Sequence, residues 1–172
     1  TVVETRSQPL PFQFPPGSPI EHCFMDFDQN RGPQKRRSTA LGSGFVIKEN
    51  GTVITNNHVI QNAEGILVKF TDGKEYEAKL IGTDPVSDIA VLKIQSNKKF
   101  TSVKFADSEK AKVGDWVLAI GNPFGLGGTV TQGIISAINR DINMGRYGNF
   151  IQTDASINQG NSGGPLFNMN GE

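Results

Sequence analysis

The sequence has little cysteine, no long apolar run and no excess of charge of either sign. Its one cysteine, Cys23, excludes an internal disulfide and a zinc site built from several cysteines. The longest apolar runs, such as residues 117–120, span only a few residues, whereas a membrane helix needs about 18. Lys and Arg together number 17, as do Asp and Glu, so no global basic field exists for nucleic acid or anionic lipid. We therefore expect no integral membrane segment and no nucleic-acid partner.

A secretory signal is also missing, because residues 1–20 lack a basic stretch followed by an apolar one. A signal peptide is therefore either absent or already removed. The chain does have 20 glycines and 11 phenylalanines among 172 residues, which suits short strands and tight turns around an aromatic core. This length allows one ordinary domain or two small lobes, and the composition favours an all-β fold.

Residues 1–40 are expected to form an N-terminal segment with a long proline-rich loop or arm. Six of the nine prolines fall there, together with several basic residues and phenylalanines. Two interpretations stay open, a disordered lead-in or an arm whose phenylalanines dock on a partner. Cys23 lies near His22, Asp26 and Asp28, but this spacing matches no recognised ligand pattern. We expect a free thiol in a mobile loop, and neither a metal ion nor a cofactor.

From residue 41 onward, short apolar stretches alternate with turn sequences. Strands are predicted over residues 41–47, 53–55, 66–70, 75–81 and 89–94, enough to close one small barrel or sandwich. A second block has candidate strands over residues 116–120, 129–138 and 150–153. The one predicted helix is about a turn long and follows His58. We expect a first barrel over residues 41–110 and a second one, only partly present, over residues 111–172.

Three polar residues stand where a rigid scaffold could present them for chemistry. Ser162 lies between Gly160 and the pair Gly163-Gly164, so the backbone can turn sharply there and direct two N–H groups at one oxyanion. His58 follows a predicted strand, and Asp88 precedes another. Each also has a plainer interpretation, namely a glycine turn, a structural histidine and a cap at the start of a strand. The order His, Asp, Ser is nevertheless one of the known orders of a serine-protease triad.

Five sequence blocks in this order resemble the protease domain of the HtrA (Deg) family of trypsin-like serine proteases. They are Gly42-Ser43-Gly44-Phe45, Thr55-Asn56-Asn57-His58-Val59, residues 84–93 (DPVSDIAVLK), Gly121-Asn122-Pro123-Phe124-Gly125, and residues 152–166, which include Gly160-Asn161-Ser162-Gly163-Gly164. The resemblance covers most of residues 41–172. It implies a chymotrypsin-like fold of two antiparallel β-barrels with the active site between them.

The resemblance also implies a role for each matching residue. Ser162 would be the nucleophile, His58 the general base, Asp88 its orienting partner, and the N–H groups of Gly160 and Ser162 the oxyanion hole. Ile157 would line the substrate pocket and favour small aliphatic side chains. Asn161 stands where digestive relatives have an aspartate that pairs with a new N-terminus, so we expect activation by a conformational change. The implied regulatory loops, residues 139–149 and 154–159, include Asn139, Arg140, Gly145, Arg146, Tyr147, Gly148, Asn158 and Gln159.

The chain departs from the family in having only ten residues after Ser162. We therefore expect an incomplete second barrel, and the PDZ domains that usually follow in this family are absent from this sequence. The family implies an ATP-independent endopeptidase of the bacterial periplasm, a homotrimer that degrades unfolded or damaged proteins, with the signal peptide removed. The alternative is a non-catalytic or latent module that binds unfolded chains as a chaperone does.

Overall fold

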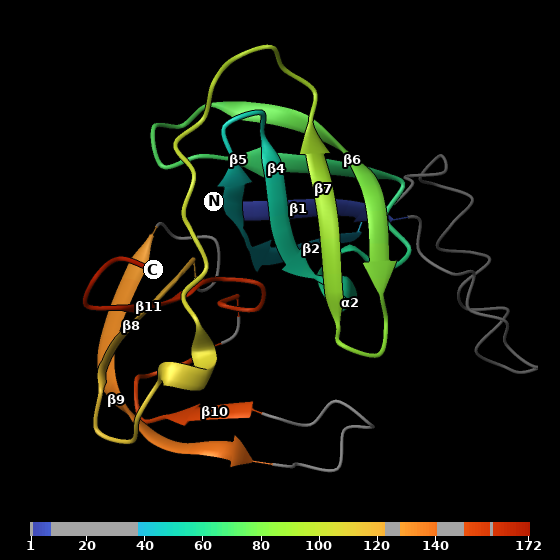
Figure 1. Cartoon of the computed structure of the whole chain (residues 1–172). Helices are drawn as coiled ribbons and strands as arrows, with labels where there is room; N and C mark the ends of the chain where they lie inside the picture. The colour runs from blue at the N-terminus through green and yellow to red at the C-terminus, as the bar shows by residue number, and fades with distance from the viewer. Residues whose placement is uncertain (1, 8–37, 123–127, 141–149, 159) are drawn as a thin grey trace, which may run out of the picture.

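The computed structural model describes residues 2–7, 38–122, 128–140, 150–158 and 160–172, and within these ranges the chain is built almost entirely from antiparallel strands (Figure 1). The first sheet contains, in spatial order, β2 (Ser38–Ser43), β1 (Val2–Ser7), β5 (Gly65–Lys69), β6 (Glu75–Asp84), β7 (Ile89–Ile94), β4 (Thr52–Asn56) and β3 (Phe45–Lys48). The second contains β10 (Phe150–Thr153), β9 (Thr129–Arg140), β8 (Trp116–Gly121) and β11 (Leu166–Asn168). The predicted all-β fold is confirmed.

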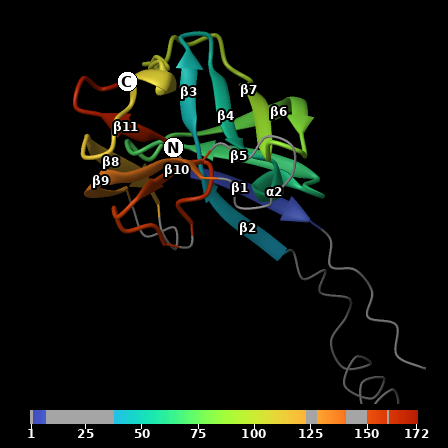
Figure 2. The same ribbon diagram turned by 60° about the horizontal axis from the view of Figure 1, so that its bottom comes forward.

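The first sheet contains one strand that the sequence analysis did not predict. β1 pairs with β2 on one side and with β5 on the other, and β1 and β2 lie side by side in both ribbon views (Figures 1 and 2). Both strands take residues from the predicted N-terminal arm, and the predicted stretch 41–47 divides at Gly44 into β2 and β3. The strand β1 has only six residues of mixed polarity, so its partners in space and not its own pattern determine its structure.

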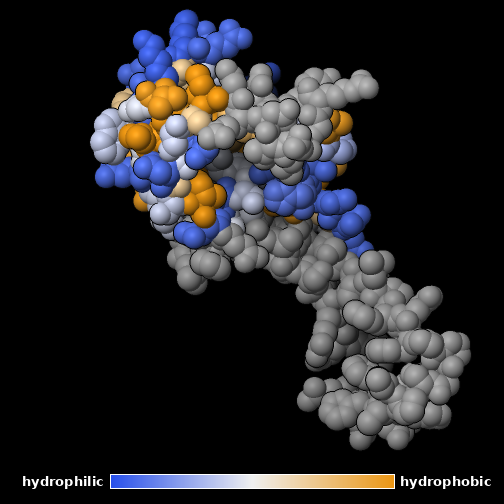
Figure 3. Space-filling view, turned by 90° about the horizontal axis from the view of Figure 1, so that it is seen from below, coloured by the Kyte–Doolittle hydropathy of each residue, from blue (hydrophilic) through white to orange (hydrophobic). Residues whose placement is uncertain are grey.

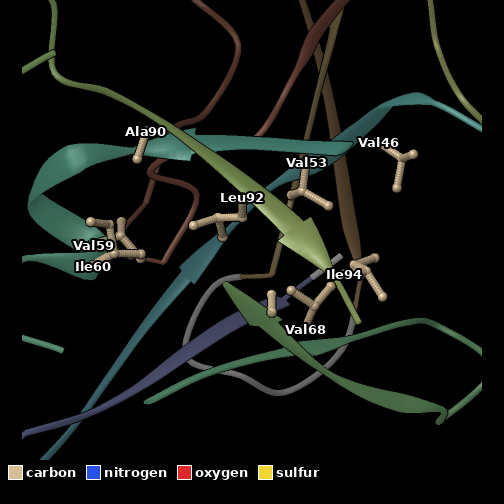
Figure 4. Packing of buried hydrophobic residues seen from close by; sticks show 9 residues of the cluster. Val46, Val53, Val59, Ile60, Val68, Ala90, Leu92 and Ile94 are labelled. Carbon is tan, nitrogen blue, oxygen red and sulfur yellow. The ribbon is translucent and has the colours of Figure 1, made fainter. Parts of the chain in front are cut away.

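The core of the first sheet follows the two-residue period of its strands. In β7, Leu92 and Ile94 are fully buried, and Lys93 between them is partly exposed. In β4, Val53 is fully buried, and the next residue, Ile54, is partly exposed. Burying an aliphatic side chain of this size stabilises a fold by about 1.5–3 kcal/mol. Figure 4 shows how these side chains gather between the strands; the buried cluster consists of Val46, Val53, Val59, Ile60, Val68, Ala78, Ala90, Leu92 and Ile94.

The second sheet is covered less completely. Val117, Ala119 and Ile135 are buried, but Trp116, Val130, Phe150, Ile151 and Leu166 are exposed although they lie in strands. In the space-filling view, apolar residues form several patches among hydrophilic ones (Figure 3). This partial cover agrees with the prediction that the second barrel is only partly present.

Two short helical turns complete the described structure. The helix α2 (Asn57–Ile60) begins directly where β4 ends (Figure 1), so the predicted turn of helix is present, but it contains His58 and does not follow it. The 3₁₀ turn η1 (Ser108–Lys110) lies in the connection between β7 and β8 and was not predicted. Because Asn56 at the end of β4 pairs with Ile89 at the start of β7, α2 and the residue before β7 lie next to each other.

Candidate active site

His58 and Asp88 are in direct contact at this junction. His58 Nδ1 lies 2.6 Å from Asp88 Oδ2, and the His58 backbone N–H donates a hydrogen bond to Asp88 Oδ1 at 2.8 Å. An ionised carboxylate only accepts hydrogen bonds, so a neutral imidazole in this contact carries its proton on Nδ1 and its lone pair on Nε2. The two side chains are 54% and 42% exposed, which makes the imidazole accessible to a substrate. This geometry suits a histidine that acts as a general base.

The backbone of Asp88 is held from behind by the residues that precede His58. Its carbonyl oxygen accepts hydrogen bonds from the Asn57 N–H at 3.0 Å and from Asn56 Nδ2 at 2.7 Å. Asn56 stands at the N-cap of α2, yet it makes no side-chain cap there, because its amide is directed at Asp88. Three consecutive residues therefore fix Asp88: Asn56 and Asn57 hold its backbone carbonyl, and His58 holds its carboxylate.

The turn that leads into Asp88 is closed by a second carboxylate, Asp84. Its Oδ1 accepts the Val86 N–H at 3.0 Å, and its Oδ2 accepts the Ser87 hydroxyl at 2.7 Å. The bond from Ser87, followed by that from Val86, lowers the pKa of Asp84, because hydrogen bonds to a carboxylate favour its charged form. Asp84 therefore shapes the turn without touching the histidine.

The segment with Ser162 lies against the strand that leads to His58. Gly160 and Gly163 both have positive φ angles, +98° and +82°. A Cβ atom at Gly163 would overlap Ser43 O and Thr55 Oγ1, and would lie 2.9 Å from the backbone nitrogen of Asn56. Only glycine combines this conformation with such a close approach. The structure thus brings the Ser162 segment against Asn56, which precedes His58 by two residues in the sequence.

Backbone hydrogen bonds hold the segment that contains the two N–H groups assigned to the oxyanion hole. Asn161 N–H donates to Asn158 O at 3.1 Å, and Gly164 N–H donates to Asn161 O at 2.8 Å. Among the residues that the structure describes, the N–H groups of Gly160 and Ser162 have no such acceptor. Unpaired N–H groups beside a nucleophile are what an oxyanion hole requires.

The structure describes some of the residues predicted for the substrate pocket and the regulatory loops. Ile157 is 58% exposed, and Asn158 is also exposed. The stretch before them is fixed on β9, where Asp154 Oδ1 accepts the Ile134 N–H at 2.7 Å and Ser156 O accepts the Thr131 hydroxyl at 2.9 Å. The other residues named for the regulatory loops are placed as follows: Asn139 and Arg140 end β9, while Gly145, Arg146, Tyr147, Gly148 and Gln159, like Cys23, lie outside the described residues.

Two polar residues at this site, Ser43 and Asn122, are buried and were not predicted from the sequence to belong to it. The only signal for them was their presence in two of the five sequence blocks. Within the described part of the chain, no group of three or more His, Cys, Asp or Glu residues is arranged to hold a metal ion. No helix in these same ranges has the length and apolar character needed to cross a membrane.

Comparison with known proteins identifies the family. Residues 42–172 match the family described as trypsin-like peptidase domain. The chain belongs to this family. The predicted chymotrypsin-like fold is thereby confirmed, with its second barrel partly present. The domain boundaries stay a prediction.

Relatives of this trypsin-like peptidase domain confirm the predicted HtrA resemblance. The probable periplasmic serine endoprotease DegP-like of Brucella suis biovar 1 (strain 1330) is 52% identical over 177 residues, covering 93% of this chain and 34% of that protein. The periplasmic serine endoprotease DegP of Escherichia coli (strain K12) is 52% identical over 161 residues, covering 91% and 34%. The solved structure of the HtrA-type protease AlgW with tripeptide has a TM-score of 0.73 at 48% identity, covering 76% of this chain and 44% of that one. The chain spans about one third of the length of these curated relatives.

Proposed function

We propose that this chain is the hydrolytic domain of an ATP-independent serine endopeptidase of the HtrA type. The observation that carries the proposal is the contact of His58 with both carboxylate oxygens of Asp88, beside a glycine-rich segment that contains Ser162. The names of the relatives, periplasmic serine endoproteases, support the same activity. They favour it over the alternative of a non-catalytic module that binds unfolded chains.

The proposed mechanism assigns each proton and bond. Ser162 Oγ attacks the scissile carbonyl carbon while His58 Nε2 takes the hydroxyl proton, and Asp88 stabilises the resulting imidazolium through Nδ1. The N–H groups of Gly160 and Ser162 stabilise the oxyanion, each by about 2.7–4 kcal/mol of barrier. The imidazolium then donates its proton to the leaving amine as the C–N bond breaks. A water molecule, deprotonated by the same Nε2, hydrolyses the acyl-enzyme and restores the serine.

The finer parts of the proposal concern substrates, assembly and location. The substrates are unfolded or damaged proteins, cut after small aliphatic residues that contact Ile157. The protein acts as a homotrimer in the bacterial periplasm after removal of its signal peptide, and the loops at residues 139–149 and 154–159 regulate the site. The names of the relatives support the location, and the resemblance to the HtrA family motivates the rest.

The decisive experiment compares the protein with its Ser162→Ala variant on unfolded casein. We expect the protein to release casein fragments and the variant to release none, because the variant keeps the fold but lacks the attacking oxygen. Thermal unfolding of both forms provides the control for folding. Equal cleavage by both would exclude Ser162 as the nucleophile. Binding of casein by both, without cleavage, would favour the chaperone-like alternative.

A further inference from the structure

Ser43, the last residue of β2, uses its side chain and backbone in four hydrogen bonds although it is only 1% exposed. Its hydroxyl donates to Gly160 O at 2.8 Å and accepts the Asn122 N–H at 2.9 Å. Its backbone N–H donates to Ser162 O at 2.8 Å. Its carbonyl oxygen accepts the Thr55 hydroxyl at 2.7 Å. A buried hydroxyl with both a donor and an acceptor partner is fully satisfied.

These bonds join parts of the chain that belong to different sheets. Ser43 and Thr55 lie in the first sheet, and Asn122 follows the end of β8 in the second. Gly160 and Ser162 belong to neither sheet and lie between them in this network. The hydroxyl of Ser43 is therefore the point at which the first sheet, the second sheet and the Ser162 segment meet.

The two carbonyl groups that Ser43 binds belong to the two residues assigned to the oxyanion hole. Gly160, with φ +98°, has the rotational freedom of glycine, and its neighbouring peptide groups can turn unless something holds them. Ser43 holds the carbonyl of Gly160 with its side chain and that of Ser162 with its backbone. The backbone between these two carbonyl groups includes the Ser162 N–H. The two hydrogen bonds therefore set the direction of that N–H.

We propose that Ser43 is a positioning residue, whose hydroxyl holds the Gly160 carbonyl so that the Ser162 N–H that follows it is directed into the oxyanion hole. This inference rests on the proposed function and adds a residue to its machinery. Ser43 touches neither substrate nor reacting atoms, and it acts through Gly160 and Ser162. Preorganised donors of this kind stabilise the transition state more than the bound substrate, so their loss lowers kcat while KM changes little.

The test replaces Ser43 and a matched buried hydroxyl elsewhere in the first sheet. Ser43→Ala removes both side-chain bonds, and Thr52→Val removes the hydroxyl that donates to Asn50 Oδ1 at 2.7 Å, at a residue that is also buried. Ser43→Cys keeps a weak donor in the same place. For each form, kcat and KM are measured on an unfolded peptide substrate. The affinity of a peptide boronate, which forms a tetrahedral adduct with the serine, and the hydrogen exchange of the Asn122 amide are measured alongside.

We expect Ser43→Ala to lower kcat and boronate affinity together, by about 10- to 100-fold, with KM within about twofold. Its Asn122 amide should exchange faster, because that N–H loses its acceptor. Ser43→Cys should have a kcat and a boronate affinity between those of Ser43→Ala and the parent. Thr52→Val should match the parent in kcat. If Ser43→Ala does not fold, Ser43→Cys decides the question by the same measurements.

An unchanged kcat and boronate affinity in a folded Ser43 variant would overturn the inference alone, provided that the parent cleaves the peptide and Ser162→Ala does not. An equal loss of kcat in Thr52→Val would also overturn it, because general destabilisation would then explain both. A parent that neither cleaves peptide nor binds boronate would instead refute the proposed function, and the inference with it.

Discussion

Asp88 has a φ angle of +54°, a left-handed conformation that residues with a side chain adopt only at a cost. The bonds from Asn56 and Asn57 to its carbonyl offset this cost and keep its carboxylate aimed at His58. Asp84 supports the same turn from the other side through Val86 and Ser87. At the scale of the residue, the histidine–aspartate contact thus depends on backbone bonds that surround it.

Protonation of Asp84 should loosen this turn. Its pKa is lower in the folded protein than in the unfolded chain, so the unfolded chain binds more protons in acid. The contribution of Asp84 to the free energy of unfolding is therefore present above the ordinary carboxyl pKa of about 4 and is lost as pH falls through the lower folded value. We expect Asp84→Asn to show a smaller acid loss of unfolding free energy than the parent, measured by urea denaturation across this pH range. Parallel pH profiles for the two forms would contradict this expectation.

Two elements meet where the end of β8 lies against the Ser162 segment, and Gly121 is the contact point. A Cβ atom there would overlap the Asn161 side chain, lying 2.6 Å from its Cγ, and would lie 2.9 Å from the Asn161 Cα. Because a backbone atom is involved, rotation of a side chain cannot relieve the overlap. The second sheet therefore fixes the position of the residue directly before Ser162.

We expect Gly121→Ala to displace Asn161 and with it Ser162. The overlap should lower the free energy of unfolding by about 1–3 kcal/mol, and peptide cleavage by more than this loss of folded protein explains. Denaturation and steady-state kinetics measure the two effects. Gly65→Ala in β5 is the matched control, since a Cβ atom there meets nothing within 4 Å. Full activity of Gly121→Ala would show that the segment tolerates the displacement.

At the scale of the element, the strands that could be predicted from the sequence are those whose own residues alternate or are bounded by turn sequences. Seven strands, β4 to β10, were placed near their observed bounds, because alternation or turn sequences mark them. The three-residue strand β11 and the mixed strand β1 were missed, since pairing with neighbours in space determines them. His58 and Asp88 were predicted to meet, as both stand at strand ends. The role of Ser43 could not be predicted, because its hydroxyl partners, Gly160 and Asn122, are distant in sequence.

For the whole molecule, the bonds of Ser43 should make the two sheets unfold together. Leu92 is fully buried in the first sheet, whereas Trp116, the single tryptophan, lies in the second and is 56% exposed. Its fluorescence therefore reports on the second sheet, while circular dichroism reports on all strands. We expect Leu92→Ala to lower the free energy of unfolding by about 2–5 kcal/mol and to shift both signals equally.

The control for this prediction is Leu80→Ala, which removes a half-exposed side chain of the first sheet and should shift neither signal by more than about 0.5 kcal/mol. A Trp116 transition that stays in place when Leu92 is shortened would show that the second sheet unfolds independently. In that case the hydrogen bonds between the sheets would not couple their stability.

The bond between Ser43 and Gly160 spans 117 residues of sequence. A ribosome releases the N-terminal part of a chain first, so His58 and Asp88 can meet while the Ser162 segment is still being made. If the proposed function holds, the nascent chain consequently has no complete hydrolytic site until the Ser162 segment has been made. A protease assembled in this order does not threaten the ribosome or neighbouring nascent chains before its own translation has passed Gly164.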